Sequence, residues 1–91
     1  MYIVLRTKSF EKDLKKVSKN KNFKRGNLEN TINILSEGKK IDSKYLNHKL
    51  HGELGDCSDL HVQNDLVLIY KKDEEIKLIA LLKLGSHSNL F

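Results

Sequence analysis

The spacing of the apolar residues changes between the two halves of the chain, and this change sets the fold class. Apolar side chains in the first half recur every three or four residues in two runs, which are Phe10, Leu14 and Val17, then Leu28, Ile32 and Leu35. This spacing is typical of amphipathic helices. From His48 onward the apolar stretches are short and turn residues separate them, which indicates strands.

Individual residues mark where the first elements begin and end. Residues 2–7 are β-branched and apolar enough to predict a strand, and Ser9 then offers an N-cap for a helix, with Glu11 and Asp13 in its positive first turn. A polar break at residues 20–22 precedes the second helix, and Gly38 is expected to close that helix.

The second half predicts a run of strands joined by tight turns. Residues 39–46 are expected to form an irregular connection, followed by strands near residues 47–51, 58–62, 66–72 and 76–84. The order is therefore β-α-α-β-β-β-β. We expect an α+β fold in which a small, antiparallel-dominated sheet carries both N-terminal helices on one face.

Length and composition limit the class of protein further. A chain of 91 residues supports one core, so residues 1–91 are expected to form a single domain. The longest apolar run, residues 79–82, is too short to cross a membrane, and residues 1–5 lack the pattern of a signal peptide. The lone Cys57 suits a reducing compartment as a small buried residue. We expect a cytoplasmic protein.

Charge is distributed unevenly along the chain. Residues 1–49 contain 13 Lys or Arg and 5 Asp or Glu, a net charge of +8, whereas residues 50–91 contain 4 and 7, a net charge of −3. A basic surface of this kind attracts a phosphate backbone or an acidic protein partner. The alternative, that the lysines are only the solvated face of a helix, stays open for Lys12, Lys15, Lys16, Lys19 and Lys21.

All the histidines lie in the second half of the chain, at positions 48, 51, 61 and 87. A turn near residues 63–64 would place His61 and Asp65 across the mouth of a hairpin. A carboxylate beside an imidazole favours its protonated form and fixes its orientation, which makes a proton-transfer unit. A purely structural hydrogen bond is the alternative. His87 follows the last strand and His48 begins an earlier one, so three imidazoles could meet along one sheet edge.

Several segments together resemble the YafQ branch of the RelE-like bacterial toxins. They are residues 9–14, the segment His48-Lys49-Leu50-His51-Gly52, the Asp-x-His-x3-Asp core of residues 59–65 with the apolar run to residue 70, and the Gly-Ser-His-Ser-x-Leu-Phe end at residues 85–91. The resemblance runs nearly the whole length of the chain. Each motif alone is weak, whereas the combination is specific.

The resemblance implies the toxin of a type II toxin–antitoxin system, a ribosome-dependent endonuclease that cuts mRNA in the ribosomal A site. RNA carries its own 2′-hydroxyl nucleophile, so cleavage needs a base, an acid and positive charge, with no metal or other cofactor. The implied partners are the ribosome, mRNA and an acidic antitoxin. A segment of that antitoxin would become ordered on the basic helices, in a heterotetramer or larger complex.

The resemblance also assigns roles to individual residues. It implies a catalytic set of His48, His61, Asp65 and His87, supported by Asp59 and Phe91. Within this set, His87 would act as the general acid or contact the phosphate, and Asp65 with His61 would form the base side. Phe91 would stack on the base at the cut.

Two positions depart from the family pattern. Family members often carry arginine where this chain has Ser58, and a bulky aromatic residue where it has Leu66. Lys49 is a candidate for the missing cation, although an exposed strand lysine needs no such role. His51 matches no family position with a known role and is expected to be structural.

Three other functions are compatible with the sequence. Three histidines and an aspartate suit zinc, although no HExxH or CxxC spacing supports such a site. A related toxin scaffold poisons DNA gyrase by binding, a role that needs no clustered proton-transfer groups. A non-catalytic RNA-binding module would be favoured if His87→Ala left activity in cells unchanged.

Overall fold

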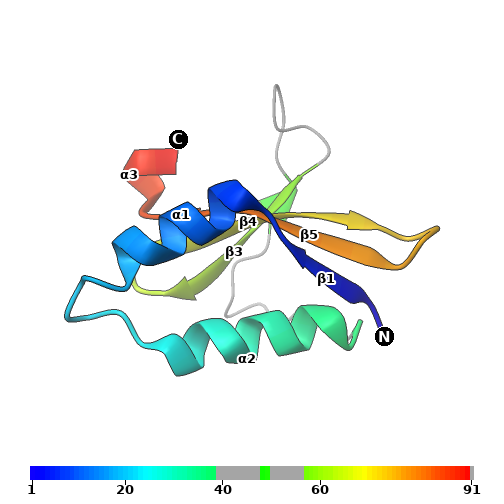
Figure 1. The fold of residues 1–91 in the computed structure, drawn as a ribbon, viewed down its shortest axis with the longest axis horizontal. Coiled ribbons are helices and arrows are strands. Elements are labelled where there is room, and N and C mark those ends of the chain that lie inside the picture. The colour runs from blue at the N-terminus through cyan, green and yellow to red at the C-terminus, as the bar shows by residue number, and fades with distance from the viewer. Residues whose placement is uncertain (39–47, 50–56, 91) are drawn as a thin grey trace.

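The predicted order of elements is confirmed in the computed structural model, which describes residues 1–38, 48–49 and 57–90 (Figure 1). The elements are β1 (Ile3–Arg6), α1 (Lys8–Val17), α2 (Arg25–Ser36), β2 (His48–Lys49), β3 (Ser58–Gln63), β4 (Leu66–Asp73), β5 (Leu78–Gly85) and α3 (His87–Leu90). The connection expected at residues 39–46 lies outside the described residues, and β2 is described by its backbone. The short helix α3 was not predicted.

The strands form one sheet in the order β1-β5-β4-β3-β2. Strands β2 to β5 pair antiparallel with their neighbours, as the predicted meander requires. β1 pairs parallel with β5, and Ile3 lies opposite Leu78. The first strand of the chain is therefore held against the last, and β5 has a neighbour on each side.

The helices share one core with the sheet, which confirms that their apolar stripes face the same layer. α1 contacts β5 and α2 contacts β3. Their buried side chains are Phe10 and Leu14 from α1, and Leu28 and Leu35 from α2. None of the helices in the described ranges is long and apolar enough to cross a membrane.

The first five residues of strand β4 are buried on both faces of the sheet. Leu66, Leu68 and Tyr70 belong to the core cluster under the helices. Val67 and Ile69 alternate with them and are also fully buried, at 0% exposure. Tyr70 is buried at 4% exposure, and Cys57 is a buried free thiol, as expected.

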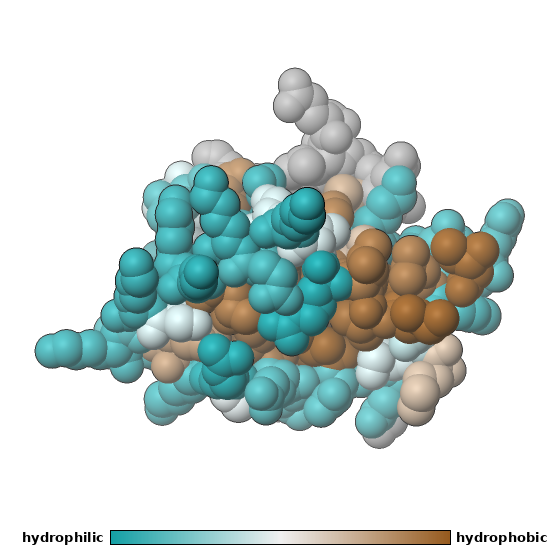
Figure 2. All heavy atoms as spheres, viewed as in Figure 1, coloured by the Kyte–Doolittle hydropathy of each residue, from teal (hydrophilic) through white to brown (hydrophobic). Residues whose placement is uncertain are grey.

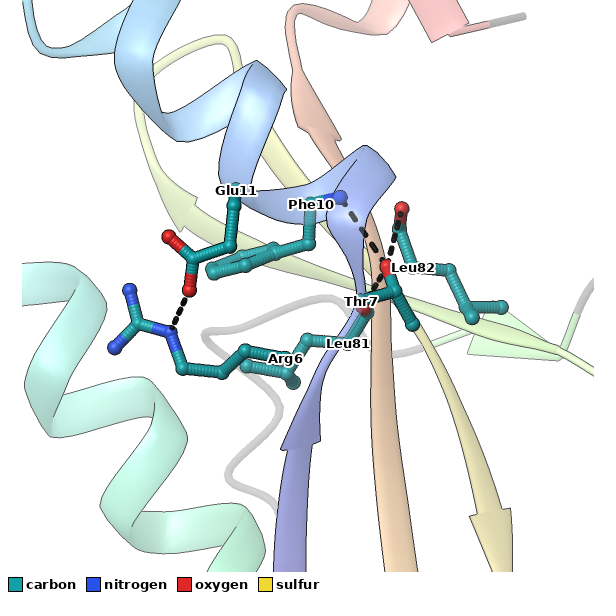
Figure 3. Close-up of polar contacts among 6 residues, drawn as sticks. All are labelled: Arg6, Thr7, Phe10, Glu11, Leu81 and Leu82. Carbon is teal, nitrogen blue, oxygen red and sulfur yellow. Dashed lines mark hydrogen bonds and ion pairs between the residues drawn. The ribbon is translucent and has the colours of Figure 1, made fainter.

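The N-cap of α1 is Thr7 rather than Ser9, so the prediction from sequence was wrong by two residues. The Thr7 hydroxyl accepts a hydrogen bond from the Phe10 amide at 3.2 Å and donates one to the Leu81 carbonyl of β5 at 2.7 Å (Figure 3). One side chain thus caps the helix and ties it to the sheet. Beside it, Arg6 and Glu11 form an exposed ion pair at 2.7 Å (Figure 3).

The end of α2 agrees with its prediction. Gly38 has a φ of 71°, a left-handed conformation that glycine adopts without steric cost, and its amide donates to the Leu35 carbonyl at 3.1 Å. The start of α2 follows Lys24, whose side chain makes no capping hydrogen bond.

Substitution of the two candidate N-caps should have unequal effects on stability. We expect Thr7→Ala to lower the free energy of unfolding by about 1 to 2 kcal/mol, because it removes both the cap and the bond to β5. Ser9→Ala should change it by no more than about 0.5 kcal/mol, since Ser9 is exposed. Urea denaturation followed by circular dichroism measures both, and equal losses would contradict the assignment of the cap.

Candidate active site

The hairpin formed by β3 and β4 carries two of the predicted catalytic residues, His61 and Asp65. Its turn is formed by Asn64 and Asp65, and Asp65 has a φ of 52°, a left-handed conformation that aspartate tolerates better than most residues. The register shifts between His61 and Gln63, so the strand is irregular just before the turn. Such bulges increase local twist and redirect side chains.

His61 and His87 meet at one corner of the sheet although they are 26 positions apart in sequence. Their ring centroids are 6.4 Å apart, and the ring planes are tilted by 49°. The reason lies in the register, because Val67 of β4 pairs with His61 on one side and with Gly85 on the other. His87 begins α3 two residues after Gly85 and so comes to lie near His61.

Leu90 packs against the start of this final segment. Its side chain lies 3.4 Å from the position that a Cβ would occupy at residue 85. The Ser86 hydroxyl and carbonyl accept hydrogen bonds from the amides of α3. Leu90 therefore packs over residue 85, and together with these hydrogen bonds it holds α3, which begins with His87, against the end of β5.

Asp65 does not pair with His61 in the expected way. Its carboxylate instead accepts a hydrogen bond from the backbone amide of His87 at 3.3 Å. No hydrogen bond between the His61 imidazole and the Asp65 carboxylate occurs among the described residues. The left-handed turn sends the carboxylate across to the end of β5, so Asp65 contacts the segment that carries His87.

A second carboxylate holds the same segment from the helix side. Asp13 of α1 accepts a hydrogen bond from the Leu84 amide at 3.0 Å. Sequence reasoning placed Asp13 in the first turn of the helix, but the only acidic residue there is Glu11. Asp13 lies farther along α1, directly over the end of β5. The only feature of the sequence that could have indicated this contact is the position of Asp13 directly before Leu14, a residue of the apolar stripe.

Three more of the predicted site residues, His48, Lys49 and Asp59, lie on β2 and β3. Asp59 is buried, at 3% exposure, and the backbone of His48 lies opposite it in the β2–β3 pair. The next pair sets Lys49 opposite Ser58, the position where family members often carry arginine. His51 and Phe91 lie outside the described residues. Within the described ranges, no group of three or more potential metal ligands is found.

A groove adjoins this corner on the helix side. It has a volume of about 1220 Å³ and is lined by the α1–α2 connection, the β3–β4 turn, and the junction of β5 with α3. Gln63 joins two of these walls, because its side chain accepts from the Lys24 amide at 3.0 Å and donates to the Asn22 carbonyl at 2.8 Å. Asp13 and Asp65 both lie in the wall of the groove.

Two helices on one face of a small, mostly antiparallel sheet, with His61 of β3 close to His87 after the last strand, are the features of RelE-like toxins. Comparison with known families narrows this class. Residues 2–91 match the family described as YafQ, bacterial toxin of type II toxin–antitoxin system. The chain belongs to this family.

Solved structures agree with that assignment. A metal-bound toxin from Helicobacter pylori is 35% identical with a TM-score of 0.89, and a copper-bound mutant toxin from the same organism is 32% identical with a TM-score of 0.90. Both alignments cover 100% of each chain. YafQ in the Escherichia coli DinJ–YafQ complex is 26% identical with a TM-score of 0.86, covering 100% of this chain and 99% of YafQ. A comparison with curated proteins gives no significant match.

Two substitutions at position 65 separate the hydrogen bond from the backbone conformation. Asp65→Gly permits the left-handed φ but removes the acceptor, whereas Asp65→Asn permits that φ and keeps an acceptor oxygen. We expect the His87 amide to exchange its hydrogen about fivefold faster or more in Asp65→Gly, corresponding to about 1 kcal/mol for the lost bond. Exchange in Asp65→Asn should stay near the wild-type rate. Nuclear magnetic resonance measures both, and unchanged exchange in Asp65→Gly would contradict the tether.

Proposed function

We propose that this protein is an endoribonuclease, a ribosome-dependent toxin that cleaves mRNA in the A site by attack of the RNA's own 2′-hydroxyl group. Its membership of the YafQ toxin family supports the biological role. The observation that carries the chemistry is the approach of the His61 and His87 rings to 6.4 Å. Two imidazoles at this separation reach the substituents of one phosphorus atom.

The proposed reaction needs only proton transfer and charge stabilisation. A base removes the proton of the 2′-hydroxyl, the 2′-oxygen attacks phosphorus, the bond from phosphorus to the 5′-oxygen breaks, and an acid protonates that oxygen. The products are a 2′,3′-cyclic phosphate and a 5′-hydroxyl end. In our proposal His61 is the base, and His87 is the acid or the phosphate contact.

Asp65 then acts as a positioning residue rather than as part of the base. Its carboxylate accepts a hydrogen bond from the backbone amide of His87, so it fixes the backbone position from which the imidazole side chain extends. Effective proton transfer depends on such placement, because small displacements of a catalytic group slow a reaction strongly. This differs from the pairing of Asp65 with His61 that the sequence suggested.

The other residues of the predicted set keep supporting roles in the proposal. His48 would supply a third imidazole, and its backbone position opposite the buried Asp59 supports that role. Lys49 would provide positive charge where Ser58 replaces arginine, since the two residues are paired across β2 and β3. Phe91 would stack on a base at the cut.

An antitoxin partner follows from the relatives. The Escherichia coli structure holds YafQ together with DinJ. We propose that this chain likewise pairs with an antitoxin in the cytoplasm, an acidic protein that contacts the basic helices in a heterotetramer or larger complex. Long-range attraction by the +8 charge of residues 1–49 would speed that association.

Metal-dependent function is the second candidate, because the two Helicobacter pylori toxins are metal-bound. His61 and His87 offer two imidazole donors at one corner of this chain. Zinc and copper sites commonly use imidazole, but they need further ligands to complete the coordination shell. A cleavage assay with and without a chelator separates this possibility from the metal-independent reaction.

The proposal is tested by adding purified protein to ribosomes programmed with a defined mRNA, with EDTA present, and mapping cuts by primer extension. We expect cuts in phase with codons, leaving a 2′,3′-cyclic or 3′-phosphate end. His87→Ala should slow cleavage by about 100-fold or more, since general acid–base groups contribute that much. Naked RNA is the control and should stay intact.

The other outcomes point to the alternative functions. Cleavage that EDTA abolishes and added metal restores would support the metal-dependent candidate. Folded, antitoxin-free protein that cuts in no lane would contradict the nuclease, and inhibition of gyrase supercoiling by the same sample would favour a binding toxin. Cleavage undiminished by His87→Ala would remove His87 from the mechanism.

A further inference from the structure

We propose that the groove between the α1–α2 connection and the β5–α3 junction binds single-stranded RNA, with Lys16, Lys21 and Lys24 contacting its phosphates. This inference rests on the proposed function, which makes RNA the substrate. It adds a binding surface to the reacting histidines.

The first observation is that the positive charges of the groove are free. Lys16, Lys21 and Lys24 line it, are exposed, and form no ion pair with any described residue. Three cations elsewhere have acidic partners, since Arg6 pairs with Glu11, and Lys72 and Lys77 pair with Glu74. Lysines outside the groove such as Lys8, Lys12 and Lys15 make no ion pair with a described residue either, so the groove is distinguished by how its lysines gather around one hollow. Unpaired ammonium groups keep their full attraction for phosphate, and they release its counterions on binding.

The acidic residues of the groove are engaged with the backbone. Asp13 bonds to the Leu84 amide and Asp65 bonds to the His87 amide. The fourth lysine of the lining, Lys83, donates to the Ser9 hydroxyl at 3.2 Å. Four lysines and two hydrogen-bonded carboxylates leave the groove with a net positive charge.

The second observation is a wall rich in side-chain amides, which are Asn20, Asn22, Asn27, Gln63, Asn64 and Asn89. Those of Asn64 and Asn89 make no hydrogen bond with described residues. An amide both donates and accepts, so it can bond to the edges of unpaired bases. Such edges are accessible in single-stranded RNA and covered in a duplex.

The third observation is that the groove is held in shape before any ligand binds. Gln63 fastens the hairpin to the α1–α2 connection, and the Asn20 side chain accepts from the Asn22 amide at 2.8 Å. A preformed surface loses little conformational entropy on binding. The lysines of the connection are therefore presented at fixed backbone positions.

The groove also reaches the segments that flank the two histidines in sequence. Asp65 lines the groove and is bonded to the His87 amide, and Gly85 and Ser86 line it just before His87. In Figure 1 the α1–α2 connection and α3 lie at the same end of the molecule. An RNA chain lying in the groove would therefore pass beside the segment that carries His87, while His61 and His87 themselves lie outside the groove lining.

A protein segment is the less suitable occupant. Protein interfaces have apolar centres from which charge is depleted, whereas this groove has four lysines and six side-chain amides beside its apolar residues. Those apolar residues are Val17, Phe23, Leu66, Leu84 and Leu90. The large apolar side chains that are exposed are Met1 just before β1, Ile3 and Leu5 on β1, and Ile76 in the β4–β5 turn. These elements meet the beginning of β5, whereas the groove adjoins its end, and Figure 2 shows the brown surface on the side away from α3.

The test compares two triple variants with equal changes of charge. The groove variant carries Lys16→Gln, Lys21→Gln and Lys24→Gln. The matched control carries Lys8→Gln, Lys12→Gln and Lys15→Gln, which are exposed and do not line the groove. The probe is a fluorescent 2′-O-methyl RNA of roughly twelve nucleotides, within the range of single-strand sites. It has no free 2′-hydroxyl and so cannot be cut.

Anisotropy titrations at several salt concentrations give the affinity and its dependence on salt. Loss of three phosphate contacts should flatten the slope of log affinity against log salt by about 2, and weaken binding at low salt roughly tenfold to a hundredfold. The control should change affinity less than about threefold. Circular dichroism of both variants checks that they are folded.

Several results would overturn the inference. They are equal losses in both variants, unchanged RNA binding by the groove variant, and no measurable binding by the wild type. If the groove variant instead loses affinity only for a polyglutamate peptide, the groove is a site for an acidic protein segment.

The ribosome assay on the same samples separates the groove proposal from the nuclease proposal. Wild type that binds RNA through the groove but never cuts contradicts the nuclease alone, whereas wild type that cuts while the groove variant binds normally contradicts the groove alone.

Discussion

The structure depends on the placement of β5 between β1 and β4. Ile79 and Leu81 of this strand are fully buried at 0% exposure, and the parallel pairing with β1 brings the start of the chain against them. Thr7 bonds to the Leu81 carbonyl, and Asp13 bonds to the Leu84 amide. Because α1 is fastened to β5 at both points, the end of β5 has a fixed position, and His87 follows directly from it.

Local patterns predicted the elements, but they did not predict the contacts between them. The spacing of Leu28, Ile32 and Leu35 was sufficient for α2, and Gly38 for its end, because helix periodicity and left-handed caps are properties of neighbouring residues. Thr7 was missed as the N-cap because its advantage comes from a second bond to β5, 74 positions away. The parallel β1–β5 pair is equally remote in sequence, and no local pattern encodes it.

The candidate site shows the same division. The motif pointed to His61 and His87, and the register through Val67 explains how two such distant residues become neighbours. The expected pairing of Asp65 with His61 assumed a regular hairpin. A register shift and a left-handed turn intervene, and they direct the carboxylate to β5 instead. Spacing along one hairpin cannot reveal a contact with a third strand.

The two aspartates link the geometry of the corner to the charge of the groove. Asp13 and Asp65 sit among lysines, where their charge would oppose the binding of phosphate. Each carboxylate accepts a hydrogen bond from a backbone amide of the segment around His87, and the dipole of that amide offsets part of the carboxylate's negative charge. Replacing either by a neutral residue that cannot accept a hydrogen bond would make the groove more basic but would release the chain that carries the imidazole. Placement of His87 therefore requires the two carboxylates as hydrogen-bond acceptors, whereas attraction of RNA would be stronger without their negative charge.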